Sequence, residues 1–122
     1  MSNIKTFKEL AVWQKAHKLV LGCYQITNKF PKQEMFSLTS QIRRAVISIP
    51  ANIVEGFRRK TVRDSIHFYN IADASLEELK YHLLLSHDLQ YINEKEYQEI
   101  LSLCEEVSKM LNSWIKSQKR YL

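Results

Sequence analysis

Along four long segments of this chain, apolar residues return every three or four positions. That spacing places them on one face of an α-helix, whereas a half-buried strand would alternate at every second residue. The 122 residues include only two glycines and two prolines, and a sandwich or barrel needs a turn signal about every 8–12 residues. We therefore predict an all-α protein.

The apolar pattern predicts helices over about residues 7–29, 35–59, 62–89 and 94–116. Connections of only about 4–6 residues make consecutive helices antiparallel neighbours. No repeat, low-complexity segment or linker divides the chain, so residues 1–122 are expected to form a single domain. The predicted architecture is an antiparallel up-down-up-down four-helix bundle.

Two of these helices have recognisable capping residues at their start. Thr61 precedes Asp64 by three positions, which suits an N-cap, and Asn93 precedes Glu96 by three, which is the spacing of a capping box.

In the first predicted helix, the expected core stripe comprises Leu10, Trp13, Ala16, Val20, Tyr24 and Thr27.

Pro50 lies inside the second predicted helix. Its ring clashes with the carbonyl of Val46, and the proline removes one backbone hydrogen bond. The apolar spacing passes through Pro50 without changing phase, which favours a continuous helix that is kinked near this residue. A break, with Ser48 as the N-cap of a new helix, is the alternative.

Positive charge is concentrated in the first half of the chain. Residues 1–63 hold 12 Lys and Arg against 3 Asp and Glu, whereas residues 64–122 hold 6 against 10. The densest basic cluster comprises Arg58, Arg59, Lys60 and Arg63. A second patch comprises Lys109, Lys116, Lys119 and Arg120. The first cluster has four cations within six positions, which is more than helix capping needs. We therefore consider both patches as candidate sites for the phosphates of a nucleic-acid backbone.

A polar stripe runs along the second predicted helix beside its apolar face. Its Ser, Asn and Gln side chains suit hydrogen bonds at a packed surface, although a solvated face is the alternative. Gly56 costs about 1 kcal/mol relative to alanine inside a helix, which indicates that another backbone comes close. We assign a structural or interface role to Gln41, Arg44, Ser48, Asn52, Glu55 and Gly56, with Arg44 and Glu55 as candidate ion-pair members.

Nothing in the sequence indicates an active site or a metal site. Glu78 lies four residues before His82, but metal sites in bundles need Glu-x-x-His on two helices and further glutamates. Glu78 is therefore grouped with the structural residues. The chain has no glycine-rich phosphate loop, nucleophile elbow or HExxH motif. We expect no enzyme activity, no metal and no cofactor.

Several blocks of the sequence resemble a known family. They are FKELAVWQKA at residues 7–16, QIRRA at 41–45, SIPANIVEG at 48–56 and IADASLEEL at 71–79. At their spacing, these blocks are similar to the four-helix-bundle proteins encoded within intervening sequences of 23S rRNA genes. Ala74 departs from the glycine that is usual in the family, which weakens the argument for close packing at that turn.

The family in turn resembles the accessory variability determinant of diversity-generating retroelements. The resemblance implies a ring-shaped homopentamer with a basic surface. The retroelement relative binds nucleic acid and its reverse transcriptase, so RNA or DNA and a reverse transcriptase or other protein are implied as partners. No catalytic residue is implied.

Together, these observations predict a non-enzymatic, oligomeric helical bundle that binds nucleic acid, RNA or a ribonucleoprotein above all, through its basic patches. The alternative is a protein-interaction scaffold whose basic half docks an acidic protein. Cys23 and Cys104 stand in apolar stretches without a CxxC pair, so we interpret both as core residues of a reducing compartment. No leader or membrane span is evident, and a cytoplasmic protein without a membrane partner is expected.

Overall fold

A computed structural model describes residues 4–122, which form four α-helices and contain no β-strand. The helices are α1 (Ala11–Thr27), α2 (Leu38–Arg58), α3 (Val62–Asp88) and α4 (Glu94–Lys119). Two short 3-10 turns, η1 (Phe7–Glu9) and η2 (Lys32–Glu34), precede α1 and α2. The all-α prediction is confirmed.

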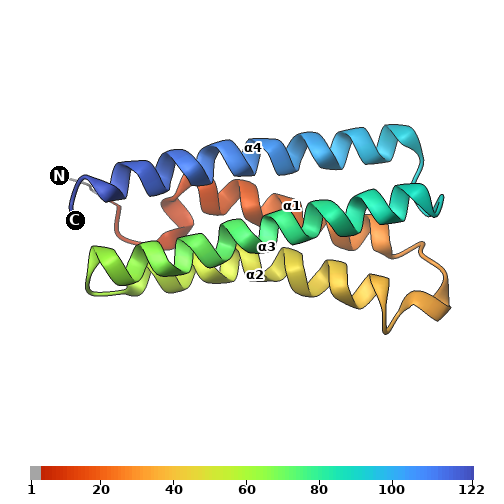
Figure 1. The fold of residues 1–122 in the computed structure, drawn as a ribbon, viewed down its shortest axis with the longest axis horizontal. Helices are drawn as coiled ribbons and strands as arrows, with labels where there is room; N and C mark the ends of the chain where they lie inside the picture. The colour runs from red at the N-terminus through yellow and green to blue at the C-terminus, as the bar shows by residue number, and fades with distance from the viewer. Residues whose placement is uncertain (1–3) are drawn as a thin grey trace.

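The four helices lie side by side, and the chain reverses direction at each connection (Figure 1). α1 and α3 each pack against α2 and α4, and the α2–α3 seam is the most extensive of these contacts. One end of the bundle holds the start of α1, the α2–α3 connection and the end of α4. The opposite end, called the far end below, holds the α1–α2 connection and the α3–α4 turn.

The first helix begins four residues later than predicted. Residues 7–9 form the separate turn η1, in which the carboxylate of Glu9 accepts hydrogen bonds from the backbone N–H groups of Lys5 (2.9 Å) and Thr6 (2.8 Å). Leu10 then adopts an extended conformation and is buried. Burial of the Leu10 side chain therefore separates the turn from α1, although the local sequence suits a longer helix.

The predicted core stripe of α1 is partly wrong. Trp13, Val20 and Tyr24 are only half-buried, and the fully buried positions of this helix are Val12, Ala16, Leu19, Cys23 and Thr27. The reason is that α1 contacts both α2 and α4, so its buried face is rotated toward the seam between these helices. Trp13 and Val20 pack against the edge of the core instead, and the Trp13 ring lies edge-on to Phe7, with 4.9 Å between the ring centres.

Cys23 and Cys104 are both buried and unbonded, as expected of core residues. Burial raises the pKa of the Cys23 thiol, and it raises that of Cys104 to about 12. Both thiols therefore stay protonated at neutral pH and behave as small apolar side chains.

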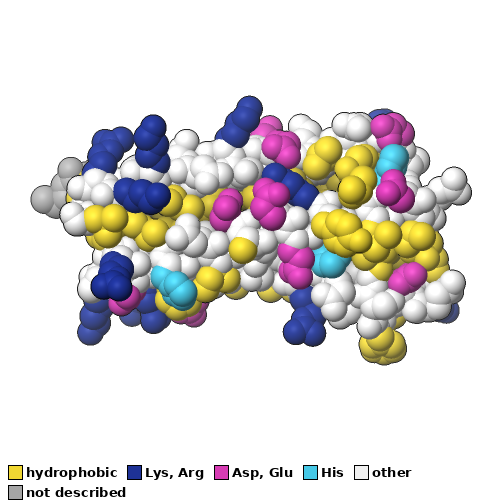
Figure 2. All heavy atoms as spheres, viewed as in Figure 1, with side chains coloured by type: hydrophobic (Ala, Val, Ile, Leu, Met, Phe, Trp, Pro, Cys, Tyr) yellow, Lys and Arg dark blue, Asp and Glu magenta, His cyan; other side chains and the backbone are white. Residues whose placement is uncertain are grey.

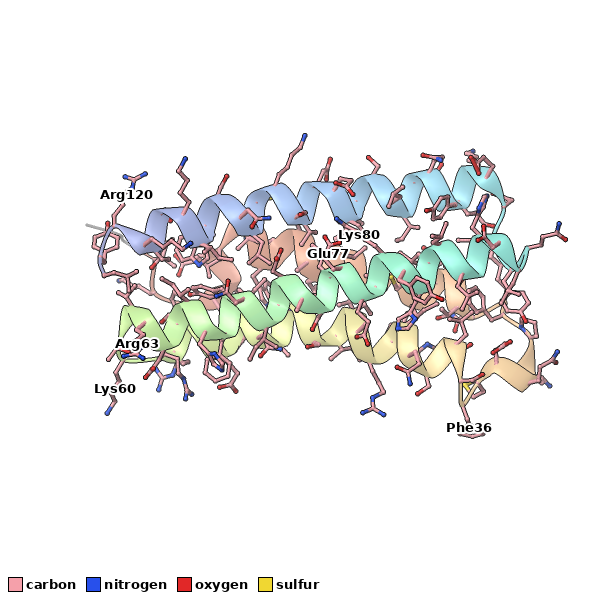
Figure 3. The ribbon with its side chains drawn as sticks, viewed as in Figure 1. Phe36, Lys60, Arg63, Glu77, Lys80 and Arg120 are labelled. Carbon is pink, nitrogen blue, oxygen red and sulfur yellow. The ribbon has the colours of Figure 1, made fainter. Side chains whose placement is uncertain are left out.

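The second helix begins at Leu38 rather than near Met35, because Ser37 leaves helical geometry. Phe36 consequently lies outside the helix and points away from the bundle at the far end (Figure 3). α2 then continues without interruption through the buried Pro50, so the alternative of a break with an N-cap at Ser48 is wrong. The apolar stripe that crosses the proline in phase keeps Ile49 and Ile53 in the core.

Both predicted caps are present. The Thr61 hydroxyl accepts a hydrogen bond from the N–H of Asp64 (3.1 Å) at the start of α3. At the start of α4, Asn93 Oδ1 accepts from the N–H of Glu96 (2.8 Å), and Glu96 Oε1 accepts from the N–H of Asn93 (2.9 Å). α4 continues to Lys119, three residues beyond its predicted end. None of the helices in residues 4–122 combines the length and the apolarity needed to cross a membrane.

Candidate nucleic-acid interface

The two basic patches predicted from separate parts of the sequence lie at one end of the bundle. Lys60 and Arg63 stand at the α2–α3 connection and Arg120 at the end of α4, and all three appear at the same end in Figure 3. We call this end the basic end and define it by Arg58, Arg59, Lys60, Arg63, Lys116, Lys119 and Arg120. On the face shown in Figure 2, Lys and Arg side chains gather at this end, and most of the acidic side chains lie over the middle and toward the far end.

Helix capping explains only part of this cluster. Arg58 lies in the last turn of α2, and Lys116 and Lys119 lie in the last turn of α4. The helix dipole favours cations at these places by about 0.3–1 kcal/mol each. Arg63 instead lies in the first turn of α3, where the dipole opposes a cation, and Lys60 lies between helices. The last two residues therefore have no local reason to be basic.

Most of these cations are exposed and unpaired within the described part of the chain. Arg59 is the exception, because its Nη2 donates to Glu55 Oε2 (3.1 Å) and its Nε to the Glu55 carbonyl (3.2 Å). Its guanidinium also lies 5.1 Å from the centre of the Phe68 ring. The other six have no ion pair with a carboxylate among residues 4–122 and are free to attract an anion.

A cleft of about 540 Å³ joins the two patches. Its walls include the aromatic rings of Phe57, Tyr69 and Trp114, and the rings of Tyr69 and Trp114 meet edge to face at 6.2 Å. Burial raises the pKa of the Tyr69 hydroxyl, an effect that the nearby Trp114 indole partly offsets, so this hydroxyl stays neutral. The basic residues that line the cleft are Arg59, Lys60 and Arg120.

The other predicted basic residues do not line this cleft. Arg58, Arg63, Lys116 and Lys119 belong to the basic end but do not line the cleft. Lys109 lines a different depression, between the start of α1 and α4. Sequence analysis missed Tyr121, a cleft residue with 71% exposure. The run Lys119–Arg120–Tyr121, an aromatic residue directly after two cations, is the signal that could have found it.

The predicted structural residues divide into two groups. Ser48 and Asn52 lie at the contact between α2 and α3: Ser48 Oγ is 2.8 Å from Ser75 Oγ, and Asn52 Nδ2 donates to Ser48 Oγ (2.9 Å) and to its carbonyl (2.8 Å). Gln41, Arg44, Glu55 and Glu78 are exposed. Among the described residues, Glu55 forms an ion pair with Arg59, whereas Arg44 has no carboxylate partner, so only one of the two candidate ion-pair members is paired.

Gly56 is required by the close approach of α2 and α3. A Cβ atom at this position would lie 2.9 Å from the Ser65 carbonyl oxygen and 2.4 Å from Cε1 of Tyr69. A backbone carbonyl of a neighbouring helix cannot move aside without disturbing that helix, so only glycine fits at this position. This agrees with the close backbone approach inferred from the sequence, and it sets Tyr69 against α2, where its ring lines the cleft.

Residues 4–122 contain no group of three or more His, Cys, Asp or Glu side chains able to hold a metal ion. Glu78 Oε1 lies 3.8 Å from His82 Nε2, and no third ligand accompanies this pair within the described residues. The exposed cations of the basic end can attract and hydrogen-bond anions beside an aromatic cleft.

Fold and charge distribution thus define a class, the four-helix bundles that carry a basic surface at one end. The chain belongs to the 23S rRNA-intervening sequence protein family, whose model matches residues 8–113. The resemblance inferred from the sequence blocks is confirmed.

A solved structure of the same kind supports this assignment. The chain is similar to a protein of unknown function from the S23 ribosomal protein family of Bacteroides thetaiotaomicron, with 30% sequence identity and a TM-score of 0.78. The similarity covers 87% of this chain and 99% of the other. No curated protein matches the sequence.

Proposed function

We propose that this protein is a non-enzymatic, homo-oligomeric helical bundle that binds nucleic acid through its basic end. The ligand that we expect is RNA or a ribonucleoprotein. The observation that carries the proposal is the gathering, at one end of the fold, of six exposed cations from two distant parts of the chain, none of which pairs with a carboxylate among residues 4–122. Lys60 and Arg63 are not explained by helix capping, and a phosphate backbone is the partner that such a surface attracts at long range.

Membership of the family supports this reading. The family is named after the intervening sequences of 23S rRNA, and the resemblance noted above implies a homopentamer. In a ring of identical subunits, the basic end would be repeated around the axis, and repeated weak sites gain affinity through effective concentration. The two free, buried cysteines suit a reducing compartment, and this supports our proposal that the protein is cytoplasmic.

The first test is the salt dependence of binding. Affinity for short RNA and DNA oligonucleotides is measured by fluorescence anisotropy between about 50 and about 200 mM salt. Neutralising about six phosphates predicts a loss of roughly 10³-fold in affinity over this range, because bound counterions are released. Affinity that does not change with salt would refute the electrostatic mechanism.

The second test assigns the binding to one end. The triple variant Arg58→Glu, Lys60→Glu, Arg63→Glu reverses three basic-end charges, and we expect at least a tenfold loss of affinity. The matched control, Lys32→Glu, Arg44→Glu, Lys95→Glu, changes net charge equally at exposed residues elsewhere and should retain most of the affinity. Equal losses in both variants would contradict the assignment.

Two further measurements separate this function from its alternative. Size-exclusion chromatography with light scattering reports the oligomer, and the ratio of absorbance at the nucleic-acid and protein maxima reports co-purified nucleic acid. A protein-interaction scaffold, or an adaptor for a reverse transcriptase, would instead capture one protein in a pull-down that nuclease treatment does not change. That result without oligonucleotide binding would overturn the proposal.

A further inference from the structure

We propose that the cleft at the basic end holds an unpaired base of a single-stranded nucleic acid, while cations at its rim contact the flanking phosphates. This inference rests on the proposed nucleic-acid binding and adds the strandedness and the contact residues. It starts from the cleft itself, whose walls are more apolar than a surface for phosphates alone requires.

The size and walls of the cleft suit a planar ring. Its volume of about 540 Å³ lies within the range of about 300–1,000 Å³ that is usual for pockets of small ligands. Phe57 and Trp114, both half-buried, supply aromatic surface, and hydrophobic side chains lie between the cations of this end in Figure 2. Every base has an apolar face that can pack there, but a duplex keeps its bases stacked inside and offers only its phosphates.

The cations on the rim are placed for the backbone on either side of such a base. The guanidinium of Arg59 is already held by Glu55 and lies over Phe68, so it is the least available of the three. Lys60 and Arg120 come from opposite sides of the cleft, one from the α2–α3 connection and one from the end of α4. Neither has an ion pair with a described carboxylate, so these two residues are assigned to the phosphates.

Tyr121 is the side chain that would complete the site. It lines the cleft next to Arg120 and is 71% exposed, whereas Tyr69 is only 2% exposed. An exposed aromatic ring beside cations is the arrangement with which proteins that bind single strands stack bases without reading their sequence. We therefore assign stacking to Tyr121.

The experiment compares single-stranded oligo(U) and oligo(dT) with a duplex of equal length. Tyr121→Ala should lower affinity for the single strands by about tenfold and leave affinity for the duplex unchanged, whereas Tyr121→Phe should keep both. The control is Tyr81→Ala, which removes a ring of 60% exposure from the middle of α3, away from the cleft. Circular dichroism is used to check that each variant remains folded.

A spectroscopic readout tests occupation of the cleft directly. The chain has two tryptophans, Trp114 in this cleft and Trp13 on the α1–α2 face. In a Trp13→Phe background, the emission of Trp114 should be quenched by the single strand and not by the duplex. Tyr121→Ala should shift this quenching to higher oligonucleotide concentrations.

The possible outcomes separate this inference from the function on which it rests. If the wild-type protein binds neither single strand nor duplex, the proposed function fails and the inference with it. If it binds both, and Tyr121→Ala weakens neither or weakens both equally, the proposed function stands and the base-binding cleft is refuted. A duplex that quenches Trp114 as strongly as the single strand would refute it as well.

Discussion

At the far end of the bundle, polar side chains bond to one another across the connections, whereas at the basic end most charged side chains face solvent. Tyr91 Oη donates to Glu34 Oε2 (2.8 Å), which joins segments 57 residues apart. Arg43 donates to Thr27 Oγ1 (3.0 Å) and to Asn28 Oδ1 (3.1 Å), and so ties α2 to the end of α1.

The α3–α4 turn, also at the far end, is likewise held by contacts between polar side chains. His87 Nε2 lies 2.6 Å from Glu94 Oε2 across the α3–α4 turn, and the His87 ring stacks on Tyr97 at 4.5 Å. Lys29 forms an ion pair with Glu96 between α1 and α4. Several charged side chains of the far end are thus bonded within the structure, although Lys32 and Lys95 are exposed and have no carboxylate partner among residues 4–122.

The basic end is held together by packing instead. Here Gly56 lets α2 approach Ser65 and Tyr69 of α3, and Arg59 alone of the seven defining cations has a carboxylate partner among residues 4–122. A charged group that is already hydrogen-bonded has to lose that bond before it binds a ligand, whereas an exposed cation does not. The comparison shows how one bundle can be stable at both ends and still keep one of them available for binding.

Of the substitutions that test this difference between the two ends, Gly56→Ala is expected to have the largest effect on stability. The added methyl group would overlap the Ser65 carbonyl and the Tyr69 ring, so the free energy of unfolding should fall by about 2 kcal/mol. Urea denaturation followed by circular dichroism measures the change.

Gly22→Ala is the matched control. Its Cβ would lie 3.1 Å from Cδ1 of Ile100, which is the flexible end of a side chain and can shift. Because alanine is the better helix former by about 1 kcal/mol, this variant should be as stable as the wild type or slightly more so. Equal destabilisation by both substitutions would show that the α2–α3 seam is not exceptionally close.

A smaller difference is expected between the two helix caps. Asn93→Ala, at the far end, removes the 2.8 Å bond from the N–H of Glu96 to Asn93 Oδ1 and keeps the bond from the backbone N–H of residue 93 to Glu96 Oε1, so it should cost about 1 kcal/mol of unfolding free energy. Thr61→Ala, at the basic end, removes one bond of 3.1 Å and should cost less. Thermal unfolding of the two variants ranks them, and a larger cost for Thr61→Ala would reverse the comparison.

The smallest expected effect is a dependence of stability on acid pH at the far end. Hydrogen bonds from Ser37 and then from Tyr91 lower the pKa of the Glu34 carboxyl below its ordinary value of 4.5. A lowered pKa in the folded state means that the stabilisation is present above the unfolded pKa and is lost as pH falls through the folded one. Stability should therefore decrease below about pH 4.5.

Glu34→Gln tests this dependence, because it removes the titrating group while keeping a hydrogen-bond acceptor. Urea denaturation just above and well below the ordinary carboxyl pKa should show a smaller loss of stability in this variant than in the wild type. Some loss will remain, since backbone N–H groups of Thr6 and Lys5 lower the pKa of Glu9 as well. An unchanged acid loss in Glu34→Gln would mean that the far-end bonds contribute nothing to it.

Much of this structure could be predicted from short stretches of sequence. The caps at Thr61 and Asn93 were found because a capping residue acts on a backbone group only three positions away. A close approach of another backbone at Gly56 was inferred from the conformational cost of glycine within a helix, and the structure shows that this backbone belongs to α3. The rotation of α1 was missed, because Trp13 and Val12 are both apolar and only the positions of α2 and α4 decide which of them is buried.

The candidate site shows the same division. Its cations were visible as two clusters of sequence, but nothing local relates Lys60 to Arg120 or places Tyr121 beside an aromatic wall. The sequence by itself determined the helices and their approximate limits, because apolar periodicity and capping act over three or four residues. Only the tertiary structure decided that two basic clusters share one cleft, because that depends on how four helices pack at once.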